Sequence, residues 1–163
     1  MLNGDFFKKI YEIINYRPFI AILCGWLMTG FGQIYNGQLL KGLLFGIPNT
    51  TINFYGHLNE ALLYAFLGDI EKSQTILNYQ WILFYPAIFD ISHWDAYEVS
   101  YEIQRKCAPP VSHKLPFILS GMFATVGVIF GSKYFPGPIY LGLGGYLVGG
   151  LIGVILIKLG KPS

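Results

Sequence analysis

Apolar segments alternate with short polar connectors along this chain. The predominantly apolar stretches are residues 18–30, 39–57, 77–93, 115–131 and 138–159. A helix needs about 20 mostly apolar residues to cross the hydrocarbon layer of a bilayer. The pattern therefore predicts an all-helical, polytopic integral membrane protein with about five transmembrane helices, the first of which is short or tilted.

Two further segments are amphipathic rather than uniformly apolar. Residues 5–16 and 58–70 place apolar side chains at helical spacing, with charged residues on the remaining positions. A helix of this kind lies in the membrane interface with its apolar side toward the acyl chains. We expect both segments to be interfacial helices.

The second and third apolar stretches contain helix-disturbing residues. Pro48 is followed by Asn49 and Thr50, and Pro86 lies within residues 77–93. Proline removes a backbone hydrogen bond, and neighbouring polar side chains can satisfy the freed carbonyl or bond to another helix. The second stretch is therefore either a kinked packing helix or the polar lining of a small cavity. The helix after Pro86 is expected to continue to about Lys106.

The pair Pro109-Pro110 is the clearest boundary in the chain. We expect an N-terminal interfacial helix at residues 1–17, a three-span module at residues 18–107 with a surface helix at 58–72, and a two-helix transmembrane hairpin at residues 108–163. Glycines spaced by four dominate the hairpin: Gly127, Gly131, Gly145, Gly149 and Gly153. Such spacing favours close helix contact, either within the hairpin or with a second copy or another subunit.

Composition supports the membrane class. Hydrophobic residues make up 53% of the 163 residues and charged residues only 12%, about half the share of a soluble domain. The net charge of +2 comes from scattered residues, so no nucleic-acid partner is expected. Cys24 and Cys107 belong to no spaced metal motif and are expected to be free thiols.

Five crossings would put five Lys and Arg residues on one side of the bilayer and six on the other, which does not decide the orientation. Arg105, Lys106 and Lys114 share one connector, however. This favours a cytoplasmic position for that connector, for residues 30–42 and for the C-terminus.

An ionisable residue inside a span suggests a function unless it is paired or hydrogen-bonded. In an antiparallel arrangement Lys41, at the start of the second span, and Asp90, near the end of the third, come to similar depth. We expect Asp90 either to form a functional pair with Lys41 or to anchor the glycine-rich connector through Lys41, Gln33 or backbone amides.

No motif indicates a reaction. His57, Asp90, His93 and His113 lack the spacing of a metal site, and the chain has no phosphate loop, dinucleotide fingerprint or hydrolase motif. We expect no catalytic residue, metal or cofactor, and expect the histidines to be interfacial.

The connector at residues 30–42 and a later tetrapeptide carry a resemblance. Gly32-Gln33-Ile34-Tyr35-Asn36-Gly37 followed by Lys41-Gly42, and then Trp94-Asp95-Ala96-Tyr97 after a later span, resemble small bacterial membrane proteins with a GQxYNGxxxKG signature, related in layout to TM2-domain proteins. The resemblance covers roughly residues 18–106, although TM2-domain proteins often carry His where Gly32 stands. It implies a structural or interaction role for matching positions: Gly32, Gln33, Tyr35, Gly37, Lys41, Gly42, Trp94, Asp95 and Tyr97.

The sequence thus favours a non-catalytic protein of a bacterial plasma membrane. We expect a scaffold, assembly factor or accessory subunit, whose partners are the lipid bilayer and either other membrane subunits or further copies of the chain. The alternative is a small transporter or channel component that uses polar residues of a kinked helix pair, namely Asn49, Thr50, Asn53 and Asp90.

Overall fold

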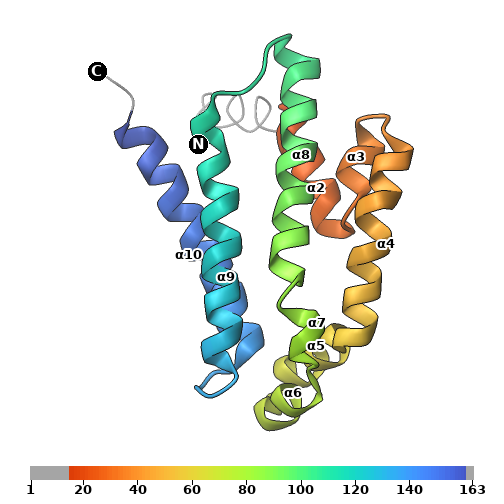
Figure 1. Cartoon of the computed structure of the whole chain (residues 1–163). Coiled ribbons are helices and arrows are strands. Elements are labelled where there is room, and N and C mark those ends of the chain that lie inside the picture. Colours follow the sequence, from red (N-terminus) through yellow and green to blue (C-terminus); the bar gives the residue numbers. More distant parts are fainter. Residues whose placement is uncertain (1–14, 161–163) are drawn as a thin grey trace, which may run out of the picture. The chain divides into compact units, whose positions relative to one another are not determined.

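The computed structural model describes residues 15–160, and in that range the chain forms helices and no strand, which confirms the all-helical class (Figure 1). The helices are α2 (Arg17–Leu27), α3 (Phe31–Tyr35), α4 (Leu39–Gly56), α5 (Leu58–Phe66), α6 (Ile70–Ile76), α7 (Tyr79–Ile82), α8 (Tyr85–Arg105), a 3₁₀ turn (Val111–Lys114), α9 (Leu115–Gly131) and α10 (Pro138–Leu159). The predicted interfacial helix at residues 5–16 falls almost entirely outside the described residues.

Two segments of the described chain are long and apolar enough to cross a membrane. They are Val111–Gly131 and Pro138–Leu159, with mean hydropathies of 1.6 and 2.0. Only 17% and 22% of their most apolar windows are buried, whereas the core helix of a soluble protein would be mostly buried. The two helices are therefore compatible with membrane association, and the number of five crossings stays a prediction.

The third predicted span, residues 77–93, is not one continuous helix. Residues 77–93 form the short helix α7 and, after a break, the first part of α8. Pro86 therefore lies in the first turn of α8, where the missing N–H has no intrahelical partner to lose. Beyond that point α8 continues through residues 94–97 to Arg105, as predicted, and Lys106 follows with a positive φ of 59°.

The predicted surface helix at residues 58–70 is two helices. Gly68 adopts a φ of +87° after α5, and Asp69 then caps α6 by accepting a hydrogen bond from the backbone N–H of Lys72 at 3.0 Å. Glycine at positive φ ends helices, and aspartate begins them. The Gly68-Asp69 pair is thus the physical reason for the break.

A buried hydrogen bond and an exposed contact between an amine and an aromatic ring connect α5 to α6. The hydroxyl of Ser73 donates to the carbonyl of Ala61 at 2.8 Å. The amine of Lys72 lies 4.0 Å from the centre of the Tyr64 ring, and a hydrogen bond to this side chain raises the pKa of Lys72. The pair therefore forms a compact corner of the chain.

The chain divides into two compact units. Unit 1 contains the described part of Met1–Gly46 together with Ser92–Pro110, and unit 2 contains Ile47–Ile91 with the described part of Val111–Ser163. The apolar core of unit 2 is made of six buried side chains: Leu58, Ala61, Ala65, Leu77, Ile82 and Ile139. Each unit is made of two separate stretches of sequence, whereas the predicted segments 1–17, 18–107 and 108–163 are continuous. These predicted segments stay predictions.

Helices α9 and α10 of unit 2 form a hairpin with closely approaching backbones (Figure 1). A Cβ atom added at Gly127, Gly145 or Gly149 would overlap a carbonyl oxygen of α9 or α10 on the opposite helix. The same addition at Gly131 or Gly153 would overlap the backbone of a proline, Pro138 or Pro116. All five predicted glycines thus lie at the contact between the two helices.

Candidate functional site

The glycine-rich connector between the first two apolar stretches contains helical structure of its own. Residues 30–42 contain the whole of α3 and the first turn of α4. Gly30 begins α3 with a φ of +99°, and a Cβ there would overlap the carbonyl oxygen of Gly42. A residue with a side chain would meet both backbone strain and a collision at this position. Gly30 therefore permits α3 to fold back against α4.

Gln33 of α3 is completely buried, and its amide group is bonded at both ends. Its Nε2 atom donates to the carbonyl of Ser92 at 2.7 Å and to Oδ2 of Asp95 at 3.0 Å. Its Oε1 atom accepts from the hydroxyl of Ser92 at 3.3 Å. Burial of an amide is costly unless such bonds are made, so Gln33 joins α3 to α8.

Asn36 makes a second polar connection one turn later. Its Nδ2 atom donates to the carbonyl of Ala96 at 2.8 Å, and its Oδ1 atom accepts from the hydroxyl of Ser100 at 2.7 Å. Ser100 is itself fully buried. The amides of Gln33 and Asn36 thus bond to two successive turns of one side of α8.

Lys41 completes the arrangement from the first turn of α4. Its Nζ atom lies 2.5 Å from Oδ1 of Asp95, with side-chain exposures of 41% for Lys41 and 18% for Asp95. The expected pairing of Lys41 with Asp90 is therefore wrong. The partner Asp95 lies five residues, or about 7.5 Å, further along the chain than Asp90, because α8 does not end at residue 93 but continues to Arg105.

We call this group the polar cluster and define it by its members from the connector and from α8: Gln33, Asn36, Lys41, Ser92, Asp95, Ala96 and Ser100. It joins the two motifs that the sequence singled out. Four members were not predicted as site residues: Asn36, Ser92, Ala96 and Ser100. For the last three, the spacing of four residues, which places small residues along one side of a helix, was the available signal.

The connector glycines differ in what they do. A Cβ at Gly32 would lie 2.6 Å from both the carbonyl oxygen of Ala21 and the Cβ of Ala96, so this glycine allows α2, α3 and α8 to meet. A Cβ at Gly42 would lie 2.6 Å from the Ile34 side chain. Gly37 has open space around it and adopts a φ of +82°, which ends α3.

The aromatic residues of the two motifs lie beside the polar cluster rather than in it. Tyr35 is partly exposed, and the guanidinium of Arg17 lies 4.9 Å from its ring centre. Trp94 and Tyr97 form a tilted ring pair with centroids 5.7 Å apart, and Tyr97 contacts Tyr101 in turn.

Asp90 belongs to unit 2 and not to the polar cluster. It is 5% exposed, its carboxyl lies against Gly121 of α9, and it interacts with Tyr146 of α10. A Cβ at Gly121 would lie 2.5 Å from Oδ2 of Asp90. The lack of a side chain at this position thus makes room for the carboxyl.

His93 and His57 lie in different environments. His93 is fully buried, and its ring packs on Gly25 and meets Trp26 edge to face at 6.2 Å. His57 is exposed and lies 3.1 Å from a carboxylate oxygen of Glu60. Within residues 15–160 no group of three or more His, Cys, Asp or Glu side chains is arranged to hold a metal ion.

In comparisons with known proteins, no family model, no curated protein and no solved structure matches the chain. The geometry is therefore the basis for assigning a role. The carboxylate and amide groups of the polar cluster are bonded to partners within the cluster, and an arrangement of this kind holds helices in a fixed register.

Proposed function

We propose that this chain is a non-catalytic integral membrane protein that serves as a scaffold, assembly factor or accessory subunit of a larger membrane complex. The polar cluster carries the proposal. Gln33 and Asn36 use their amide groups within the chain, and Asp95 accepts from both Gln33 and Lys41. Because these side chains bond within the chain, their role is to position helices. Contacts with a partner would then be made by the outward surface of the chain.

The outward side chains support insertion into a bilayer. Six large apolar side chains of α4 are exposed: Leu39, Leu40, Leu43, Leu44, Ile47 and Phe54. The same holds on α10, where Leu147, Leu151 and Leu159 are exposed. Apolar surface of this extent is unfavourable in water and matches lipid tails or the apolar surface of another membrane subunit.

In this proposal α4 and α8 cross the membrane in addition to α9 and α10. Their 18 and 21 residues cover about 27 and 32 Å, close to the thickness of about 30 Å that a crossing requires. The remaining predicted crossing, residues 18–30, corresponds to α2, whose 11 residues cover only about 16 Å.

We place the protein in a bacterial plasma membrane and relate it to TM2-domain-like proteins through its two motifs. The proposal also locates the contact surface. The glycines spaced by four in α9 and α10 contact the backbone of the opposite side of the hairpin, so we expect a partner to meet large apolar side chains rather than this glycine stripe.

The test is purification from native membranes in a mild detergent, followed by native mass spectrometry to determine subunit stoichiometry. The proposal predicts a complex of fixed composition, with one or more membrane subunits or several copies of the chain. Leu44→Asn, which places an amide on the outward side of α4, should weaken this complex. Thr51→Asn, on the same helix, is the control and should leave it intact. Recovery of a lone monomer would contradict the proposal.

Burial of Asp90 favours one alternative, a small transporter or channel component. Asp90 and Asn49 are buried polar residues of helices proposed to cross the membrane. Thr50 is exposed, however, and Asn53 bonds to Asn59, so only half of the expected polar lining faces inward. Solute or proton flux into liposomes containing the purified chain, lost in Asp90→Asn and retained in Asp69→Asn, would favour this alternative.

A further inference from the structure

We infer that α2 and α3 form a re-entrant hairpin, so that the chain crosses the membrane four times and begins α2 and ends α10 on the same, cytoplasmic side. This inference rests on the membrane insertion proposed above. It replaces the predicted five crossings, in which these two points lie on opposite sides.

The start of α2 lies beside the end of α3. The Nη2 atom of Arg17 donates to the carbonyl of Tyr35 at 3.4 Å, and its guanidinium stacks over the Tyr35 ring. The N–H of Arg17 also bonds to Gln104, close to the C-terminal end of α8. Arg17, Tyr35 and the end of α8 are therefore at one level, so the chain returns at Tyr35 to the level at which α2 began.

The turn between α2 and α3 lies part of the way along α4. The carbonyl of Thr29 approaches Gly46, which is the eighth residue of α4. Seven residues of helix cover about 10 Å, roughly a third of the hydrocarbon thickness. The hairpin thus reaches into the layer and does not cross it.

The backbone of this turn is suited to such a position. Non-helical backbone at membrane depth is tolerated where protein surrounds it. Thr29 and Gly30 are both buried, the N–H of Met28 bonds to Cys24, and the N–H of Phe31 bonds to Met28. The turn therefore exposes little unpaired backbone to lipid.

The remaining helices alternate in direction. Within unit 2 the end of α4 meets α7, since the N–H of Asn78 bonds to the carbonyl of Gly56. The α9–α10 turn is at this same end, because Gln74 of α6 bonds to the carbonyl of Gly131. α4 therefore runs away from the side of Arg17, α8 returns, α9 runs away again and α10 returns.

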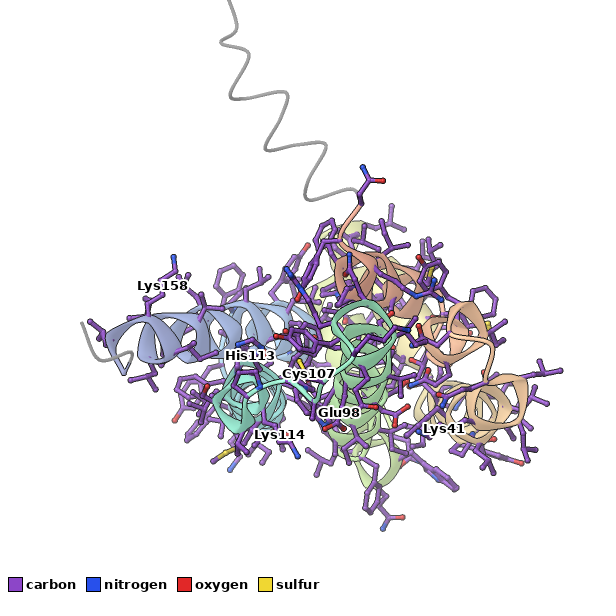
Figure 2. All side chains as sticks on the ribbon, turned by 90° about the horizontal axis from the view of Figure 1, so that it is seen from above. Lys41, Glu98, Cys107, His113, Lys114 and Lys158 are labelled. Atoms are coloured by element: carbon purple, nitrogen blue, oxygen red, sulfur yellow. The ribbon has the colours of Figure 1, made fainter. Side chains whose placement is uncertain are left out.

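This topology separates the basic residues sharply. On the side of Arg17 lie the described residues Arg17, Lys41, Arg105, Lys106, Lys114 and Lys158. Figure 2 labels the side chains of Lys41, Lys114 and Lys158. On the other side lie only Lys72 and Lys133. In the sequence, Lys8 and Lys9 precede α2 and Lys161 follows α10.

The charge distribution assigns the orientation. An excess of Lys and Arg in short loops marks the cytoplasmic side. Five crossings divided the 11 basic residues almost evenly, whereas the re-entrant hairpin transfers the residues around Arg17 to the side that already holds Arg105, Lys106 and Lys114. A single change of topology thus converts a balanced distribution into one that follows the positive-inside rule.

The test uses single-cysteine variants of the full chain in intact cells, labelled with a membrane-impermeant maleimide. The reporters are Asn15→Cys, the native Cys107, Lys133→Cys and Gly160→Cys, each with the other cysteines replaced by alanine. Cys107 is exposed in the connector after α8. We expect residues 15, 107 and 160 to react only after the cells are permeabilised, and residue 133 to react before.

Labelling of residues 15 and 133 together, with 107 and 160 protected, would overturn the re-entrant hairpin and restore five crossings. Labelling of residues 15, 107 and 160 with 133 protected would overturn the cytoplasmic assignment. Carbonate extraction of the same membranes separates these outcomes from failure of the proposed function, because a chain released by carbonate is not inserted at all. Unchanged size-exclusion profiles of the variants establish that the fold is retained.

Discussion

Asp95 of α8 accepts a hydrogen bond from Gln33 through one carboxylate oxygen and pairs with Lys41 through the other. One side chain therefore connects α8 to both α3 and α4. The two sequence motifs, separated by more than fifty residues, are parts of a single polar cluster because of this carboxylate.

The two partners of this ion pair should contribute unequally to stability. Lys41→Met is expected to cost less than about 1 kcal/mol, because the lysine is 41% exposed and exposed pairs contribute little. Asp95→Ala removes two charged hydrogen bonds from a mostly buried group and should cost about 2 kcal/mol or more. Thermal unfolding in detergent measures both, with Glu102→Ala, an exposed residue of α8, as the control. Equal losses for Lys41→Met and Asp95→Ala would contradict this interpretation.

Asn36→Asp should destabilise the chain although it changes a single atom. The carboxylate keeps the acceptor for Ser100 but loses the donor to the Ala96 carbonyl and places negative charge against that oxygen. Asn59→Asp is the matched control, since the Oδ1 atom of Asn59 only accepts, from Asn53. We expect a clear fall in the melting temperature for Asn36→Asp and little change for Asn59→Asp. Similar changes would indicate that the donor at Asn36 has no role.

Two adjacent glycines of α10 provide a test of the hairpin contact. A Cβ at Gly145 would overlap the carbonyl oxygen of Phe123, whereas nothing lies within 4 Å of a Cβ at Gly144. Gly145→Ala should therefore cost about 1–3 kcal/mol by overpacking, and Gly144→Ala should be neutral or stabilising by about 0.5–1 kcal/mol. Chemical unfolding of the detergent-solubilised chain distinguishes them. A greater loss for Gly144→Ala would place the close contact on the other side of α10.

Much of the helical layout follows from apolar runs and capping residues. Residues 39–57, 115–131 and 138–159 agree closely with α4, α9 and α10, because long apolar segments leave few alternatives to a helix. The break between α5 and α6 was not predicted, although Gly68-Asp69 combines a helix end with a helix start and was the available signal.

The polar cluster could be predicted only in part. Its two motifs are evident in the sequence. The partner of Lys41, however, depends on where α3 returns the chain. A helix of five residues has too weak a hydrophobic periodicity to be predicted from the sequence. Placing the start of the second span opposite the end of the third, at residue 93, brought Lys41 to the depth of Asp90 instead of Asp95. The serines that complete the cluster are ordinary residues in the sequence and acquire their role through this register.

The central claim is that the connector and α8 are energetically coupled through the polar cluster. A double-mutant cycle of Gln33→Ala and Asp95→Ala, measured as free energies of unfolding in one detergent, tests it directly. Because each substitution alone removes the same hydrogen bond, the double variant should be less destabilised than the sum of the single variants by about 1 kcal/mol or more. Additivity of the two losses to within about 0.3 kcal/mol, the range seen for independent sites, would contradict the account.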